Sequence, residues 1–210
     1  MRLTAGTLGV MLAVIVWTTT AAAIDITFDD LVSAGNPSVA AVETSGYRVE
    51  GPALHTIDTP GSLYVDSSSP IYLAQIYGPA GAGLTLRRLD GAAFDLYEFA
   101  AARLFVSASD GPNASQVALL GLGVGGTTLS ATYDLAATGF THFTVPPTWS
   151  HLEAMDFQGL LAGGGPGALA LDDVGVGSGP VTGSVPEPAA IVLALTTALA
   201  VGAVLLRGRS

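Results

Sequence analysis

Cysteine and lysine are both absent from the 210-residue sequence. Without cysteine the chain cannot form disulfides, thiolate-ligated zinc or iron–sulfur centres, or a thiol nucleophile. Without lysine, all seven of its basic residues are arginine, and 17 acidic residues give a formal net charge of −10. A surface of this sign repels phosphate backbones, so the composition argues against any nucleic-acid partner.

Charged residues make up only 11% of the chain, and its mean hydropathy is +0.55 because both ends are strongly apolar. At the first end, Arg2 precedes an apolar run at residues 8–17, and three alanines follow. Ala21 and Ala23 are the small residues that signal peptidase needs at positions −3 and −1. We therefore expect residues 1–23 to be a cleaved signal peptide. The alternative, an uncleaved anchor, would need a longer apolar run.

The second apolar block covers residues 189–206, which are 18 residues without a charge. At 1.5 Å per residue this block reaches about 27 Å as a helix, enough to cross the hydrocarbon core of a bilayer. Arg207 and Arg209 follow it and hold that end in the cytoplasm by the positive-inside rule. We therefore expect a single transmembrane helix, with the body outside the inner membrane. A buried core helix is the alternative, and its arginine-rich ending argues against it.

Val185 and the tripeptide Pro186-Glu187-Pro188 stand directly before this block. The order of Pro-Glu-Pro, apolar span and arginines over residues 185–210 closely resembles the PEP-CTERM sorting signal of Gram-negative bacteria. The resemblance implies that exosortase removes the tail near the tripeptide, after transient anchoring in the inner membrane. It also implies release to the cell surface or to the exopolysaccharide matrix of a biofilm. The residues alone indicate only an exported protein anchored at its C-terminus.

The body spans residues 24–176, and a Gly/Ser/Pro-rich linker at 177–184 follows it. Its helical periodicity is weak, and glycine and proline interrupt it often, which favours short strands. We therefore expect an all-β fold, a two-sheet antiparallel β-sandwich of jelly-roll type. The segment 30–46 is expected to be loop or, at most, one helical turn.

Three short motifs in the body carry a second, looser resemblance: Phe28-Asp29-Asp30, Phe94-Asp95-Leu96 and Leu171-Asp172-Asp173-Val174. They are similar to the bodies of many PEP-CTERM proteins, which look like the jelly rolls of carbohydrate-binding modules. In such sandwiches the first and last strands often pair and share a structural calcium ion. The resemblance thus implies a calcium site at Asp29, Asp30, Asp172 and Asp173. The alternative is that each Asp pair ends a strand and faces solvent, since neither has EF-hand spacing.

Trp149 is the one tryptophan left once both ends are removed. Carbohydrate binders stack sugar rings on the flat faces of aromatic side chains, so Trp149 is a candidate glycan-binding residue. Its alternative role is a core residue that closes one end of the sandwich.

Motifs for catalysis are weak. Residues 121–126 satisfy G-x-G-x-x-G, but a β-prone stretch follows where a dinucleotide site needs a helix, so we expect a glycine-rich hairpin. The three histidines form no metal-binding pair, and G-x-S-x-G is absent. Glu98, Glu153 and Asp156 could be nominated as the carboxylates of a glycosidase. We therefore expect a non-catalytic surface or matrix protein, associated with exopolysaccharide and able to bind glycan. The alternatives are a secreted hydrolase of matrix polysaccharide and a purely structural module.

Replacing Pro186, Glu187 and Pro188 together with alanine tests the sorting prediction. We expect the variant to stay uncleaved in the inner membrane, because exosortase would no longer recognise it. Fractionation and immunoblotting against the wild-type chain measure this. Normal release of the variant would contradict the exosortase assignment.

Overall fold

A computed structural model describes residues 23–31, 35–67, 70–76 and 83–178. Their regular structure consists of strands, and within them no helix is long and apolar enough to cross a membrane. The predicted signal peptide up to residue 22, the linker from Gly179 onward and the whole sorting segment lie outside the described residues. That applies to Ala21, Val185, Pro186, Glu187, Pro188, Arg207, Arg209 and the span 189–206.

Eleven strands follow one another along the described chain. They are β1 (Ala23–Ile26), β2 (Ser38–Thr44), β3 (Tyr47–Ile57), β4 (Tyr72–Gln75), β5 (Leu84–Arg88), β6 (Phe94–Arg103), β7 (Gln116–Gly123), β8 (Thr128–Asp134), β9 (Thr141–Thr144), β10 (Leu152–Leu160) and β11 (Leu169–Ser178). The all-β prediction is therefore confirmed. Ala23 and Gly177, assigned from sequence to the leader and the linker, lie opposite each other in β1 and β11.

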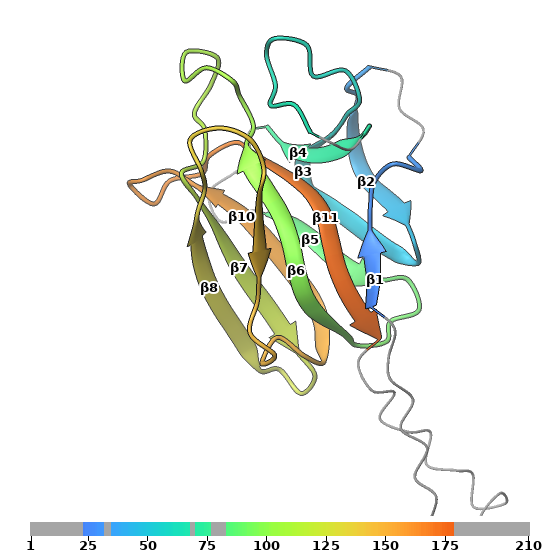
Figure 1. Cartoon of the computed structure of the whole chain (residues 1–210). Helices are drawn as coiled ribbons and strands as arrows, with labels where there is room; N and C mark the ends of the chain where they lie inside the picture. Colours follow the sequence, from blue (N-terminus) through green and yellow to red (C-terminus); the bar gives the residue numbers. More distant parts are fainter. Residues whose placement is uncertain (1–22, 32–34, 68–69, 77–82, 179–210) are drawn as a thin grey trace, which may run out of the picture.

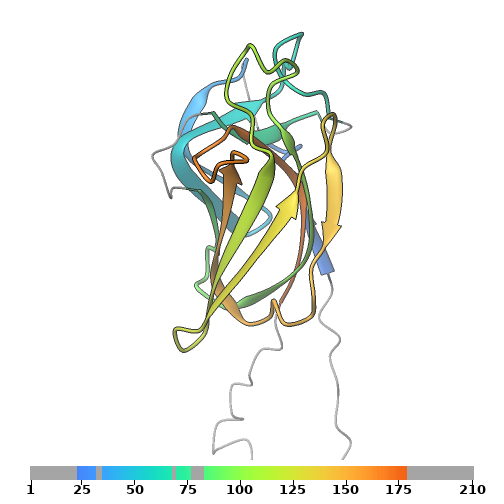
Figure 2. The ribbon, with the colours of Figure 1, turned by 90° about the vertical axis from the view of Figure 1, so that its left-hand side faces the viewer.

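The strands pair in the order β8-β7-β10-β5-β3-β4-β11-β6-β9, with β1 added to β11 and β2 added to β3. Six of them, β10, β5, β3, β4, β11 and β6, close a ring, because Leu152 of β10 also pairs with Phe94 of β6 (Figures 1 and 2). The expectation of two separate sheets therefore needs correction. The hydrogen bonds form one continuous ladder around a shared interior.

Strand β3 links β5 to β4 within this ladder. Its first residues, Tyr47–Glu50, pair with β5, and its last four, Leu54–Ile57, pair with β4. The chain bends between these halves, where Ala53 has a φ of 55°. At the bend a β-carbon on Gly51 would lie 2.6 Å from the backbone oxygen of Gly83. The missing side chain at Gly51 therefore lets β3 turn the corner in contact with the residue before β5.

The prediction of a loop over residues 30–46 is wrong for Ser38–Thr44, which forms β2. This strand is held by its neighbour, since it pairs with β3 from Thr44 opposite Tyr47 to Ser38 opposite His55. The two strands are joined by Ser45 and Gly46, whose φ values of 51° and 81° suit the tight two-residue turns of β-hairpins.

Glycines 125 and 126 also lie in a turn, with φ values of 82° and 81°, between β7 and β8. The hairpin predicted for the G-x-G-x-x-G stretch is therefore confirmed. Its first glycine has a packing role, because a β-carbon on Gly121 would come within 3.0 Å of the Trp149 ring.

The interior of the ring holds the main hydrophobic core. Phe99 is fully buried there, and its ring packs against Phe157 and Phe143 with centroid distances of 5.5 and 5.0 Å. A second, smaller cluster gathers around Tyr72 and Phe105. The first strand pairs with the last, so the ends of the described chain meet (Figure 1). Residues 23–178 therefore include all eleven strands of the described chain and both of its hydrophobic clusters.

Replacing Gly51 with alanine tests the corner. Because the added β-carbon would press on the backbone of Gly83, we expect a loss of about 1–3 kcal/mol in the free energy of unfolding. Thermal denaturation of residues 23–178 measures it. Gly163→Ala is the matched control, since a β-carbon there meets no atom within 4 Å. An equal melting temperature for both variants would contradict this account of the bend.

Candidate functional site

Trp149, the predicted glycan-binding residue, is only 4% exposed and belongs to the main core. Its indole lies over Gly121, and its backbone oxygen accepts a hydrogen bond from the Leu96 N–H at 2.9 Å. A ring packed in this way offers no open face to a sugar. The structure therefore places Trp149 in the alternative role, as a residue that fills the core.

The four aspartates predicted to share a calcium ion do not assemble into one ligand set. Asp30 accepts a hydrogen bond from the Thr44 hydroxyl at 2.6 Å, whereas Asp172 accepts one from the Ser67 hydroxyl at 2.6 Å. Among the residues described, no group of three or more acidic or histidine side chains is arranged to hold a metal ion. Asp29 and Asp173 are near enough to interact electrostatically, but the other two point to separate hydroxyl partners.

The nominated glycosidase carboxylates also lie apart in the ladder. Asp156 of β10 stands opposite Leu120 and Thr85, and accepts a hydrogen bond from the Thr85 hydroxyl at 2.5 Å. Glu153 is exposed on the same strand, near its start. Glu98 stands on β6 opposite Gly175, and β6 and β10 pair only at their first residues. These three residues therefore provide no carboxylate pair that joins β6 to β10.

The surface most suited to a ligand lies instead on the outer side of β1, β11, β6 and β9. Leu96 and Phe99 of β6 are fully or almost fully buried, yet both residues between them, Tyr97 and Glu98, are exposed. The cause is a β-bulge, because the register between β6 and β11 shifts at this point. The bulge places a tyrosine and a carboxylate next to each other on the outside, with Tyr97 37% exposed.

Two glycines of β11 make room for these side chains. A β-carbon on Gly177 would lie 2.7 Å from Cε2 of Tyr97, and one on Gly175 would lie 2.7 Å from Cγ of Glu98. The oxygens of Asp25 and Glu98 both lie within 3.5 Å of that same point above Gly175. We call Asp25, Tyr97, Glu98, Gly175 and Gly177 the outer platform. It combines an accessible aromatic ring with two carboxylates, and the side chains of Tyr97 and Glu98 cover the glycine backbone beneath them.

Further acidic groups border the outer platform. Burial raises the pKa of Asp173 above its ordinary value, and the charges of Asp29 and Asp25 add to the increase, while His142 opposes it. Asp173 also has a φ of 43°, in the left-handed region where asparagine and glycine are favoured. Its ionised form is therefore held in an unfavourable setting at neutral pH.

The sequence contained a clue to the platform. The large apolar core residues of β6 are spaced by two from Phe94 to Leu96 and by three from Leu96 to Phe99, which breaks the strand period. Such a slip indicates a bulge, and a bulge exposes two adjacent residues on one face. Simple alternation, by contrast, would have placed Tyr97 and Glu98 on opposite faces.

No protein-family model matches this chain, and no curated protein sequence matches it. Among solved structures it is similar to a family 29 carbohydrate-binding module from Piromyces equi, with 10% identity over 80% of this chain and 98% of that one, at a TM-score of 0.44. A tandem of family 22 modules from Paenibacillus barcinonensis has 11% identity over 79% of this chain and 47% of that one, at a TM-score of 0.42. A family 61 module solved with β-1,4-galactotriose has 13% identity over 65% and 86%, at a TM-score of 0.31. At these sequence identities and TM-scores, the function has to be argued from this chain's own residues.

Replacing Asp173 with asparagine tests the electrostatics beside the platform. A carboxyl group with a raised pKa in the folded state stabilises folding fully only below its unfolded pKa of about 3.9, and loses that contribution as the pH rises through the folded value. We therefore expect Asp173→Asn to stabilise the fold by about 0.5 kcal/mol more near neutral pH than well below pH 3.9, a figure discounted for partial exposure; any gain from asparagine in the left-handed region is the same at both pH values.

Thermal melts of residues 23–178 near neutral pH and well below pH 3.9, with calcium present, measure this effect. Asp110→Asn, at an exposed turn, is the control. A calcium ligand would behave in the opposite way, so a destabilised Asp173→Asn variant would restore the calcium prediction and contradict ours.

Proposed function

We propose that this chain is an exported, non-catalytic protein of the cell surface or extracellular matrix that binds exopolysaccharide through its outer platform. The observation that carries the proposal is the exposed ring of Tyr97 beside Glu98, over the side-chain-free backbone of Gly177. Sugar rings present C–H groups that pack on aromatic faces and hydroxyls that donate to carboxylates. Tyr97 offers the first kind of contact, and Glu98 and Asp25 offer the second.

The charge of the body favours a neutral polysaccharide over an anionic one. Sixteen of the 17 acidic residues lie in residues 24–178, together with only four of the seven arginines. On the platform itself both charged groups, Asp25 and Glu98, are negative. A uronate-rich chain would be repelled there, while uncharged hydroxyls would find acceptors.

The two ends of the sequence indicate how the protein would be exported, anchored and released. Signal peptidase removes residues 1–23 after export, and the apolar span at 189–206 holds the chain for a time in the inner membrane. Exosortase then removes the tail near Pro186-Glu187-Pro188 and frees the body. All three steps rest on the sequence patterns and on the resemblance to PEP-CTERM proteins.

A secreted hydrolase of matrix polysaccharide is the second candidate, and one contact favours it. Because the oxygens of Asp25 and Glu98 lie 3.5 and 3.3 Å from one point above Gly175, they are less than about 7 Å apart. Retaining glycosidases hold their two carboxyl groups about 5–5.5 Å apart, and inverting ones about 6.5–9.5 Å. Glu98→Gln separates the two functions: a hydrolase loses turnover of exopolysaccharide, whereas a binding protein releases no sugar before or after the change.

Replacing Tyr97 with alanine tests the proposed binding. Loss of an aromatic contact worth about 1–1.5 kcal/mol should weaken binding of the host's own exopolysaccharide roughly five- to tenfold. Affinity electrophoresis of residues 23–178, with and without calcium, measures this. Little stability should be lost, because Tyr97 is 37% exposed.

Leu120→Ala is the matched control, because Leu120 is 42% exposed on the outer side of β7, away from the platform. It should bind as the wild-type segment does. The proposal fails if the wild-type segment does not bind the polysaccharide, or if Tyr97→Ala binds it unchanged.

A further inference from the structure

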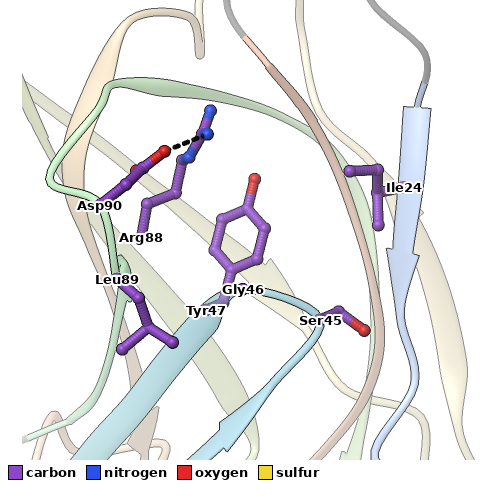
Figure 3. A pocket seen from close by; sticks show the side chains of 7 residues that line it. All are labelled: Ile24, Ser45, Gly46, Tyr47, Arg88, Leu89 and Asp90. Atoms are coloured by element: carbon purple, nitrogen blue, oxygen red, sulfur yellow. Dashed lines mark hydrogen bonds and ion pairs between the residues drawn. The ribbon is translucent and has the colours of Figure 1, made fainter.

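A separate pocket of about 210 Å³ opens at the end of the ring where the described chain begins. Its lining comes from three places: Ile24 of β1, the β2–β3 turn with Tyr47 after it, and the end of β5 with the turn that follows it (Figure 3). The complete lining is Ile24, Ser45, Gly46, Tyr47, Arg88, Leu89 and Asp90.

Tyr47 gives this pocket its chemistry. The side chain is 2% exposed, and its ring packs edge-on against Phe94 with the centroids 5.6 Å apart. Its hydroxyl points into the space between Arg88 and Ile24 (Figure 3). In the part of the chain that the structure describes, the only fully buried side-chain nitrogen or oxygen without a hydrogen-bond partner is Nε of Arg103. The Tyr47 hydroxyl forms no hydrogen bond to the described residues, so it would be a second such atom if it were fully buried. It is therefore not fully buried, and it faces the open space of the pocket.

Burial raises the pKa of the Tyr47 phenol above its ordinary value. Arg88 opposes this increase, whereas Asp90, Asp95 and Tyr97 add to it. The phenol therefore keeps its proton at neutral pH and can donate a hydrogen bond as well as accept one. A nearly buried donor without a partner in the protein is costly unless water or a ligand accepts from it.

An ion pair closes one side of the pocket. Nη2 of Arg88 lies 2.6 Å from Oδ2 of Asp90, and the other Asp90 oxygen accepts the Ala92 N–H at 2.9 Å. These two hydrogen bonds hold the pKa of Asp90 below its ordinary value, so the carboxylate stays ionised. Only one nitrogen of Arg88 contacts Asp90, which leaves guanidinium N–H groups for another acceptor.

We propose that this pocket binds a single neutral sugar unit, such as the terminal residue of a glycan chain. Tyr47 and Arg88 would donate to its hydroxyls, Asp90 and the Tyr47 oxygen would accept from them, and Ile24 and Leu89 would cover its C–H face. This extends the proposed glycan binding to a second place, and it rests on that function for its biological meaning.

Charge and size exclude other ligand classes. A cation would meet Arg88, an anion would meet Asp90 in a strongly acidic body, and within the pocket the two charges cancel. A volume of about 210 Å³ is below the roughly 300–1,000 Å³ of pockets for drug-sized ligands, so the pocket suits a ligand the size of one sugar unit.

The test uses residues 23–178 with glucose, galactose and mannose, each titrated separately and followed by saturation-transfer and ¹H–¹⁵N NMR. We expect at least one of them to saturate, with a dissociation constant on the order of 1 mM, and to shift resonances around Tyr47 and Leu89. Tyr47→Phe removes only the hydroxyl and keeps the ring against Phe94. We expect it to weaken that binding roughly three- to tenfold with an unchanged fold.

Tyr133→Phe is the matched control, because it removes a tyrosine hydroxyl from β8, far along the ladder, and should bind the sugar as the wild type does. If none of the three sugars saturates, or if Tyr47→Phe binds as tightly as wild type, the pocket proposal is overturned. Sugar binding without retention by exopolysaccharide would overturn the outer platform alone. Retention that depends on Tyr97, without binding of any of the three sugars, would overturn the pocket alone.

Discussion

The pairing of β11 along both of its edges is the constraint on which the rest of this molecule depends. One edge bonds to β6 over nearly the whole strand, and the other bonds first to β4 and then to β1. Since the first strand completes the last, the core cannot close until the two ends of the body meet. That closure fixes the outer platform, because Asp25 arrives on β1, Gly175 and Gly177 on β11, and Glu98 on β6. It also brings Ile24 to the rim of the pocket.

Two irregularities in neighbouring strands make the platform without disturbing the core. Between the pairs Leu171–Ala101 and Val176–Leu96, β11 and β6 each use five residue steps, so the register before and after is the same. Within this interval both strands break their alternation, β11 at Asp172-Asp173 and β6 at Tyr97-Glu98. One shift offsets the other. The buried faces therefore resume their alternation, while the outer face gains two adjacent side chains from β6, which lie over Gly175 and Gly177 of β11.

Residue patterns predicted the all-β fold and the hairpin at the glycine-rich stretch, because both follow from local chemistry: short β-prone segments and glycines with positive φ. They did not predict β2, whose Ala40-Ala41 centre has little strand propensity and which forms because β3 pairs with it across a tight turn. They left Trp149 open between a glycan-binding role and a core role, and its packing over Gly121 decides for the core. Residues such as Tyr47 and Arg88 meet only through the register of β3 with β5, which no local pattern reveals.

Both candidate binding places lie near the end of the ring where the described chain begins and ends, and this bears on the proposed route of export. Ser178 ends β11, and only seven residues separate it from Pro186. A linker of that length spans at most about 25 Å when fully extended. On the proposed topology, an uncleaved tail would therefore keep this end of the body close to the inner membrane. A polysaccharide would have to approach through that narrow gap.

Removal of the tail would then do more than release the protein, because it would also open the sugar-binding end to long chains in the matrix. A body that bound its polymer before release would be held at the membrane, whereas one whose binding end is hindered until cleavage can leave first and bind afterwards.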